Sequence, residues 1–129
     1  MLITVCKSKI HRAKVTAADL NYVGSITIDK ELLRASGIFE YEKVQVLNID
    51  NGVRIETYAI TGESGSGIIC LNGAAAHHFS PDDKIIIIAY GQIEADKAEE
   101  FTPKIVFVDT ENKITEIKNS EDANTFFKN

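Results

Sequence analysis

Apolar and polar residues alternate along most of this chain, and a period of two is typical of β-strands that bury one face. The alternation is clearest where Val, Ile and Thr are enriched, because branched side chains favour extended backbone. Strands are predicted over residues 2–16, with a bend near Ser8-Lys9, and over 26–28, 43–49, 53–60, 68–71, 84–90, 104–109 and, as an edge strand, 114–118. Lys9, His11 and Val15 are spaced by even numbers, so a regular strand would direct them to one face.

Local signals define how these strands are connected. Asp50-Asn51-Gly52 favours positive φ and predicts a hairpin between the strands on either side of it. Asp29 is a good N-cap and Gly37 suits the left-handed residue after a helix end, so a short helix is predicted between them. The continuous isoleucines of 84–90 indicate a strand buried on both faces. These elements predict a mainly β single domain, a small β-barrel with short helices.

The composition narrows the classes of function. A length of 129 residues suits one domain, and 44% hydrophobic with 26% charged residues is the balance of a globular protein. A net charge of −5 argues against a nucleic-acid partner, which would require clustered Lys and Arg. The longest apolar run, 85–90, is far shorter than the roughly 20 residues of a membrane helix, so no membrane association is expected. Cys6 and Cys70 are interpreted as reduced thiols of a cytoplasmic protein.

A Gly-Ser bond comes directly before the second predicted strand, between Gly24 and Ser25. Gly24 lacks a Cβ, so the backbone can turn or strain there, and Ser25 carries a hydroxyl within reach of the carbonyl before it. Attack of Ser25 Oγ on a polarised Gly24 carbonyl would convert the amide to an ester. Loss of the Ser25 α-proton would then leave a dehydroalanine, which water converts to a pyruvoyl ketone. The alternative interpretation is an ordinary turn entering a strand.

Four blocks of sequence surround this bond in a characteristic order and spacing: KSKIHR at 7–12, ADLNYVGS at 18–25, NGVRIETYAI at 51–60 and NGAAAH at 72–77. Through these blocks the chain resembles the pyruvoyl-dependent aspartate 1-decarboxylases, and the likeness extends from residue 1 to about residue 109. Each block alone is short and made of common residues. Their combination makes the resemblance specific.

The resemblance implies a double-psi β-barrel, expected over 1–118, and the polar composition of 119–129 predicts a mobile tail. It implies a zymogen that cleaves itself into a short β chain, 1–24, and a longer α chain, 25–129, whose pyruvoyl group is the cofactor. The expected lyase reaction converts L-aspartate to β-alanine and CO₂ for pantothenate synthesis. The family also implies a homotetramer with active sites at subunit interfaces. Whether maturation requires a helper protein is left open.

The resemblance also assigns roles to individual residues. Ser25 is the pyruvoyl precursor and the Schiff-base site, and Tyr58 is the proton donor. The other expected residues are Gly24 and Thr57 at the cleavage site, Lys9, Arg54, Thr57, Gly73, Ala74 and Ala75 for substrate binding, and His11, Tyr22 and Asn72 in support. Arg54 suits a carboxylate because its planar guanidinium donates two parallel hydrogen bonds. Thr57 and Tyr58 point to opposite faces of an ideal strand, so a bulge or an adjacent subunit is expected to bring both to one site.

Two other functions fit parts of the sequence. In a non-catalytic barrel used for binding or assembly, Gly24-Ser25 would be only a turn. A related decarboxylase would act on another acidic amino acid. Lys9 and Arg54 indicate that the substrate carries a carboxylate, but not how long its side chain is. No metal site is predicted, since the adjacent His77 and His78 diverge on a short helix and no other ligands cluster near them.

Overall fold

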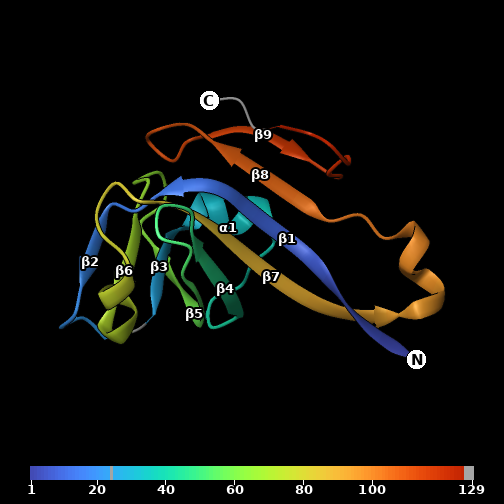
Figure 1. Cartoon of the computed structure of the whole chain (residues 1–129), viewed down its shortest axis with the longest axis horizontal. Coiled ribbons are helices and arrows are strands. Elements are labelled where there is room, and N and C mark those ends of the chain that lie inside the picture. Colours follow the sequence, from blue (N-terminus) through green and yellow to red (C-terminus); the bar gives the residue numbers. More distant parts are fainter. Residues whose placement is uncertain (24, 127–129) are drawn as a thin grey trace.

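The alternating pattern produces a mixed β-sheet in the computed structural model, which describes residues 1–23 and 25–126 (Figure 1). Its strands are β1 (Leu2–Lys14), β2 (Ala17–Asp19), β3 (Ile26–Asp29), β4 (Lys43–Asn48), β5 (Arg54–Gly62), β6 (Ile69–Asn72), β7 (Lys84–Glu94), β8 (Lys104–Val108) and β9 (Ile114–Lys118). The short helices are α1 (Lys30–Ser36) and two 3₁₀ helices, η1 (Gly73–His78) and η2 (Ala95–Glu100). The prediction of a mainly β fold with short helices is confirmed.

The strands pair in the order β2-β6-β3-β5-β4-β7-β1-β8-β9. The pairs β1/β8, β2/β6 and β3/β5 are parallel, and the other neighbours are antiparallel, including the predicted hairpin β4/β5. Beyond the end of β1, Thr16 N–H donates to the Ile69 carbonyl of β6 at 2.8 Å. This hydrogen bond links the end of β1 to β6, which lies near the other end of the strand order. This closure is compatible with a barrel. The double-psi topology stays a prediction.

The core lies inside the curved sheet. It includes inward-facing residues of β3, β4 and β7 and two leucines of α1: Ile26, Ile28, Val44, Val46, Ile85, Ile87, Leu32 and Leu33. Burying one side chain of this size stabilises the fold by about 1.5–3 kcal/mol before entropy is counted. The helix therefore acts as a cover for the core, which agrees with the structural role that its sequence indicates.

Asp29 connects the end of β3 to two other segments. Its side chain caps α1 by accepting from Glu31 N–H at 2.8 Å, and Gly37 ends the helix with φ +72°, as predicted. The same carboxylate also accepts from Gly65 N–H at 3.0 Å and from Gly67 N–H at 2.8 Å. Asp29 therefore fixes the glycine-rich connection between β5 and β6, a role that the sequence did not indicate.

The predicted bend of β1 is a pair of irregularities in its pairing with β7. The register shifts between Cys6 and Ser8 and again between Ile10 and Ala13. The second shift contains Arg12, whose φ is +59°. Lys9 and His11 are half-buried, whereas Val15 lies in the core. The prediction that these three residues share one face was wrong, because the extra residue at the shift reverses the alternation that follows it.

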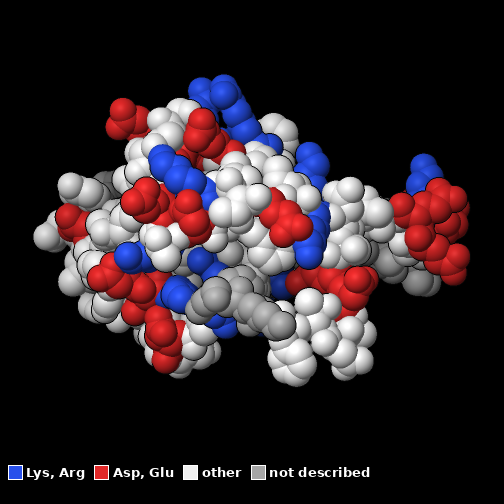
Figure 2. Space-filling view, turned by 90° about the horizontal axis from the view of Figure 1, so that it is seen from above, with Lys and Arg blue, Asp and Glu red and all other residues white. Residues whose placement is uncertain are grey.

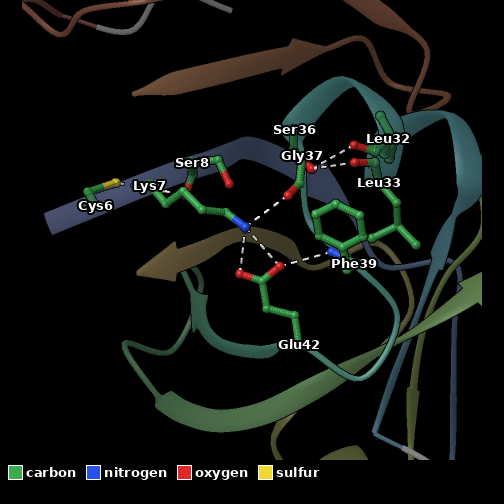
Figure 3. A network of polar contacts seen from close by, with 9 residues as sticks. All are labelled: Cys6, Lys7, Ser8, Leu32, Leu33, Ser36, Gly37, Phe39 and Glu42. Carbon is green, nitrogen blue, oxygen red and sulfur yellow. Dashed lines mark hydrogen bonds and ion pairs between the residues drawn. The ribbon is translucent and has the colours of Figure 1, made fainter. Parts of the chain in front are cut away.

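Lys7 lies in the first register shift and ties it to the loop after α1 (Figure 3). Its ammonium donates to the Gly37 carbonyl at 2.9 Å and to both carboxylate oxygens of Glu42, at 2.9 and 2.7 Å. Glu42 also accepts from Phe39 N–H at 2.9 Å. Because the ion pair is partly shielded from solvent and adds a backbone hydrogen bond, it fixes the bend more firmly than an exposed pair would.

The outer parts of β1 and β7, with η2 and the N-terminus, project from the rest of the molecule (Figure 1). Acidic side chains gather at this end in the space-filling view (Figure 2), where the sequence has Glu94, Asp96, Glu99 and Glu100.

None of the helices in the described residues is both long enough and apolar enough to cross a membrane. β9 pairs with β8 at one end of the strand order and is exposed throughout, as predicted for an edge strand.

The triple role of Asp29 leads to a stability prediction. Asp29→Ala removes the cap of α1 and leaves the buried Gly67 N–H without its acceptor, so we expect a loss of about 2–3 kcal/mol in the free energy of unfolding. Urea denaturation at a fixed protein concentration measures this loss. Asp96→Ala removes an exposed carboxylate from η2 and should change the stability by less than about 0.5 kcal/mol. Equal effects of the two substitutions would contradict the role assigned to Asp29.

Candidate active site

A cavity of about 420 Å³ lies between the start of β3, the first half of β5 and η1. Its lining contains eight of the residues expected at the site: Tyr22, Ser25, Thr57, Tyr58, Asn72, Gly73, Ala74 and Ala75. Ser25, the expected pyruvoyl precursor, and Tyr58, the expected proton donor, thus border one space. These residues come from three segments that are far apart in the sequence.

The cavity exists because one edge of β5 is left unpaired by its neighbour β3. β4 pairs with β5 from Arg54 to Tyr58 in a continuous register. On the other side, β3 pairs with β5 only from Ala59 onward, opposite Ile26. The edge before Ala59 therefore faces the cavity, and residues from both faces of the strand line it. Arg54, Glu56 and Tyr58 lie on the more exposed face of the strand.

The open edge explains how Thr57 and Tyr58 reach the same cavity. Both residues line it within one chain, and the register between β4 and β5 has no shift across the paired residues from 54 to 58. Of the two alternatives expected here, a bulge or an adjacent subunit, the bulge is therefore absent from these paired residues. Tyr58 is 39% exposed, and its ring lies 6.2 Å from that of Tyr41. The residue is thus partly open to solvent on the free chain.

Ser25 is half-buried at the first position before β3. Its carbonyl accepts from the backbone N–H of Asn72 at 2.8 Å, which extends the pairing of β3 with β6 by one residue. Gly24 lies outside the described residues, and with it the predicted cleavage of the Gly24–Ser25 bond. The described geometry thus fixes the C-terminal side of that bond against β6.

Asn72 joins the cavity wall to the interior. It is 4% exposed, and its side-chain Nδ2 donates to Thr27 Oγ1 at 3.0 Å. The thiol of Cys70 donates to Asn72 Oδ1, also at 3.0 Å. η1 follows directly, beginning with Gly73 at φ +63°. A side chain at position 73 would be strained in this conformation, so glycine is favoured at the turn into η1.

Two charged or titratable residues line the cavity that the sequence analysis did not select, Glu56 and His78. Hydrogen bonds from Lys43 and Gln45 lower the pKa of the Glu56 carboxyl, which keeps it ionised. Its spacing from Arg54 and Tyr58 was the signal that could have found it, because all three share a strand face. Among the described residues, no group of three or more His, Cys, Asp or Glu is arranged to hold a metal ion.

The structure does not bring Lys9 or His11 to this cavity. The Lys9 ammonium pairs with Glu121 at 2.7 Å, and the Lys9 side chain is 16% exposed. His11 packs edge-on against Phe107, with the ring centroids 5.5 Å apart, beside a second cavity of about 430 Å³ that residues near the C-terminus help to line. Burial lowers the pKa of His11, and the charges of Lys9 and Arg12 lower it further. The imidazole is therefore neutral at pH 7.

Arg54 lies on β5 but is also absent from the cavity lining. Its guanidinium donates to Gln45 Oε1 at 2.6 Å, and the Tyr90 hydroxyl donates to the same oxygen at 3.3 Å. Gln45 and Tyr90 line a third cavity, of about 350 Å³. Within one chain, the expected substrate-binding cations are thus separated from the cavity that contains Ser25.

Comparisons with known proteins give a consistent result. The family model described as aspartate decarboxylase matches residues 1–115. Three curated relatives carry the name aspartate 1-decarboxylase. That of Ruminiclostridium cellulolyticum is 60% identical over 94% of each chain, and that of Clostridium beijerinckii is 58% identical over 94% of this chain and 98% of its own. That of Caldicellulosiruptor saccharolyticus is 62% identical over 95% of each chain. The resemblance noted in the sequence is confirmed, and the chain belongs to the aspartate decarboxylase family.

Proposed function

We propose that this chain converts L-aspartate to β-alanine and CO₂ with a pyruvoyl group made from its own Ser25. The observation that carries the proposal is the common cavity of Ser25, Thr57, Tyr58 and the turn that begins at Gly73. Membership of the aspartate decarboxylase family supports the substrate. A non-catalytic barrel would have no need for a serine, a tyrosine hydroxyl and a small-residue turn around one space, so this alternative is not favoured.

The cofactor would be made by self-cleavage. Ser25 Oγ attacks the Gly24 carbonyl carbon, the C–N bond breaks, and the nitrogen of Ser25 takes the proton, so an ester replaces the amide. Removal of the Ser25 α-proton then breaks the Cβ–Oγ bond, which leaves a carboxylate on Gly24 and a dehydroalanine at position 25. Water adds to this end, ammonia leaves, and a ketone remains. Thr57 borders the same cavity and would assist the first step.

The residues around Ser25 fit a small uncharged ketone. Ser25 is half-buried, its carbonyl is fixed by Asn72 N–H, and small residues of η1 line the space beside it. The pyruvoyl group would supply the electron sink that ordinary side chains lack when CO₂ leaves an α-amino acid. The roles of the protein are then to bind the two carboxylates, to orient Cα and to return a proton.

Each of these roles falls to particular groups. The backbone N–H groups of Gly73 to Ala75 would donate to substrate oxygen, since small residues permit close approach. Tyr58 would return the proton to Cα, and Tyr22 and Asn72 would form the wall. Because Lys9 and Arg54 lie outside their own chain's cavity, we assign them to the carboxylates bound in a neighbouring subunit of a homotetramer, with His11 in support.

The remaining expectations belong to this proposal. They are a decarboxylase domain over 1–118, a tail over 119–129, a cytoplasmic location and a product used for pantothenate synthesis. The tail's mobility stays a prediction: Glu121 contacts Lys9, and 127–129 lie outside the described residues. A substrate panel of aspartate, glutamate and longer acidic amino acids separates the proposed enzyme from a relative with another substrate.

The cleavage has a direct test by intact mass. The unaltered chain should give fragments 1–24 and 25–129, whereas Ser25→Ala should leave one chain and release no CO₂ from aspartate, because the nucleophile is gone. Gly65-Ser66 is a second Gly-Ser bond in an exposed turn, so Ser66→Ala is the matched control and should be cut normally at 24. Aspartate decarboxylation by Ser25→Ala would refute the proposal.

Tyr58→Phe tests the proton donor. The ring is kept, so self-cleavage should proceed, while kcat for aspartate should fall by about 10²–10³-fold because the proton donor is missing. Mass spectrometry measures the extent of self-cleavage, and CO₂ release per mole of cleaved chain gives kcat. Tyr41→Phe removes the hydroxyl of the neighbouring exposed tyrosine and should leave kcat within about twofold. An unchanged kcat in Tyr58→Phe would exclude this role.

Mixed oligomers test the division of the site between subunits. Arg54→Ala and Tyr58→Phe should each be nearly inactive, but an equal mixture assembled together should recover about a quarter of the normal activity, since one site in four receives both intact residues. Ser25→Ala mixed with Tyr58→Phe should recover nothing, because Ser25 and Tyr58 line the same chain's cavity. Recovery in the second mixture but not in the first would contradict this assignment.

A further inference from the structure

Two pairs of polar residues share one face of the β3/β6 ladder. Thr27 is paired with Cys70. Two residues before Thr27, the Ser25 carbonyl accepts a hydrogen bond from the Asn72 N–H. Because side chains alternate along strands, Ser25 and Thr27 lie on the same face as Asn72 and Cys70. The residues between them, Ile26 and Leu71, are fully buried in the hydrophobic core on the other face. Thr27, Cys70 and Asn72 therefore lie together on this face beside Ser25, and we call these three residues the polar ladder.

The side-chain amide of Asn72 is held at both of its ends by this ladder. Its Nδ2 donates to Thr27 Oγ1 at 3.0 Å, and its Oδ1 accepts from the Cys70 thiol at 3.0 Å. Asn72 is 4% exposed, so little water can replace these hydrogen bonds. The Thr27 hydroxyl can donate or accept, whereas the Cys70 sulfur is only a weak acceptor, so the Cys70 thiol favours the orientation in which Oδ1 faces it and Nδ2 faces Thr27.

Cys70 is suited to remain a donor. Burial raises the pKa of its thiol, and the negative charge of Asp19 raises it further. The sulfur therefore keeps its proton at neutral pH, and its 3% exposure excludes most oxidants. Although it is buried, Cys70 is not a member of the main hydrophobic cluster. Its hydrogen bond to Asn72 thus gives this buried thiol a role other than packing.

We propose that Thr27 and Cys70 are positioning residues for self-cleavage: they orient the Asn72 amide so that its second N–H group is presented to the cavity beside Ser25. The Nδ2 group has two hydrogens, one of which is used on Thr27. The other is available to an oxygen in the cavity that Asn72 and Ser25 line together. A fixed donor of this kind stabilises an oxygen on which negative charge develops, whereas a rotating amide does so only part of the time.

The cleavage arm of the test rests on the proposed function and uses the full chain. Thr27→Val keeps the shape and removes the acceptor, so the first-order rate of cleavage into 1–24 and 25–129 should fall about tenfold. Thr27→Ser restores the acceptor and should cleave within about twofold of the unaltered rate. Thr115→Val makes the same change on the exposed strand β9 and is the matched control. Equal rates for Thr27→Val and Thr115→Val would overturn the proposal.

Cys70 gives the same test from the other end of the amide. Cys70→Ala should slow cleavage about threefold, because a thiol is a weaker donor than a hydroxyl or an amide, and Cys70→Ser should restore the rate. If Thr27→Val fails to fold, this pair of variants decides the question. A rate in Cys70→Ala equal to that in Cys70→Ser, with both proteins folded, would contradict the role of Cys70.

The structural arm does not depend on cleavage. In the Ser25→Ala chain, which cannot process itself, NMR measures hydrogen exchange of the Asn72 side-chain amide. Exchange should be about tenfold faster in Ser25→Ala/Thr27→Val than in Ser25→Ala, and it should return to the slow rate with Thr27→Ser. If the unaltered chain is never cut, the proposed function fails. The exchange measurement still tests whether Thr27 orients the Asn72 amide. Unchanged exchange in the Thr27→Val chain would refute the orientation of the amide by Thr27.

Discussion

The site depends on the position at which β3 begins to pair. Ile26 is the first residue of β3 that pairs with both neighbours, with Ala59 of β5 and with Leu71 of β6. Before that point β5 keeps only its hairpin partner β4, so an edge of β5 is open where Thr57 and Tyr58 reach the cavity. Because unpaired strand edges and their side chains are accessible to small molecules, this termination of pairing opens a space that η1 and the segment before β3 then enclose.

The two ends of β3 are fixed by buried polar groups of different kinds. At the C-terminal end, the Asp29 carboxylate binds the first turn of α1 and two N–H groups of the glycine-rich connection. At the N-terminal end, Asn72 binds the Ser25 carbonyl through its backbone and Thr27 through its side chain. Since the strand has only four residues, these directional contacts define its register, while Ile26 and Ile28 supply the apolar burial.

Local order could be predicted from the sequence more fully than the site. Period-two alternation and the Asp29 and Gly37 signals act over a few residues, so the hairpin, α1 and every strand except the three-residue β2 were foreseen. The face of Val15 was not, because nothing local indicates the positive φ of Arg12. The cavity depends on β3 pairing with β5 and β6, contacts between distant segments that periodicity does not specify. The separation of Lys9 and Arg54 from Ser25 has the same non-local origin.

A cut between 24 and 25 would cost this fold little, and the reason lies in the order of its elements. Asp19 ends β2 and Ile26 begins β3, so the bond falls in a segment that belongs to no strand. Residue 25 on the new end is still tied to β6 through the Asn72 N–H, and Ile26 and Ile28 remain anchored in the core. On the other side, β2 keeps its parallel pairing with β6 from Ala17 to Asp19. The chain on each side of the bond is therefore held by one strand, β6, through Asp19 on one side and through residue 25 on the other. β6 also carries Cys70 and Asn72, so the geometry around position 25 is maintained by contacts that cleavage does not remove.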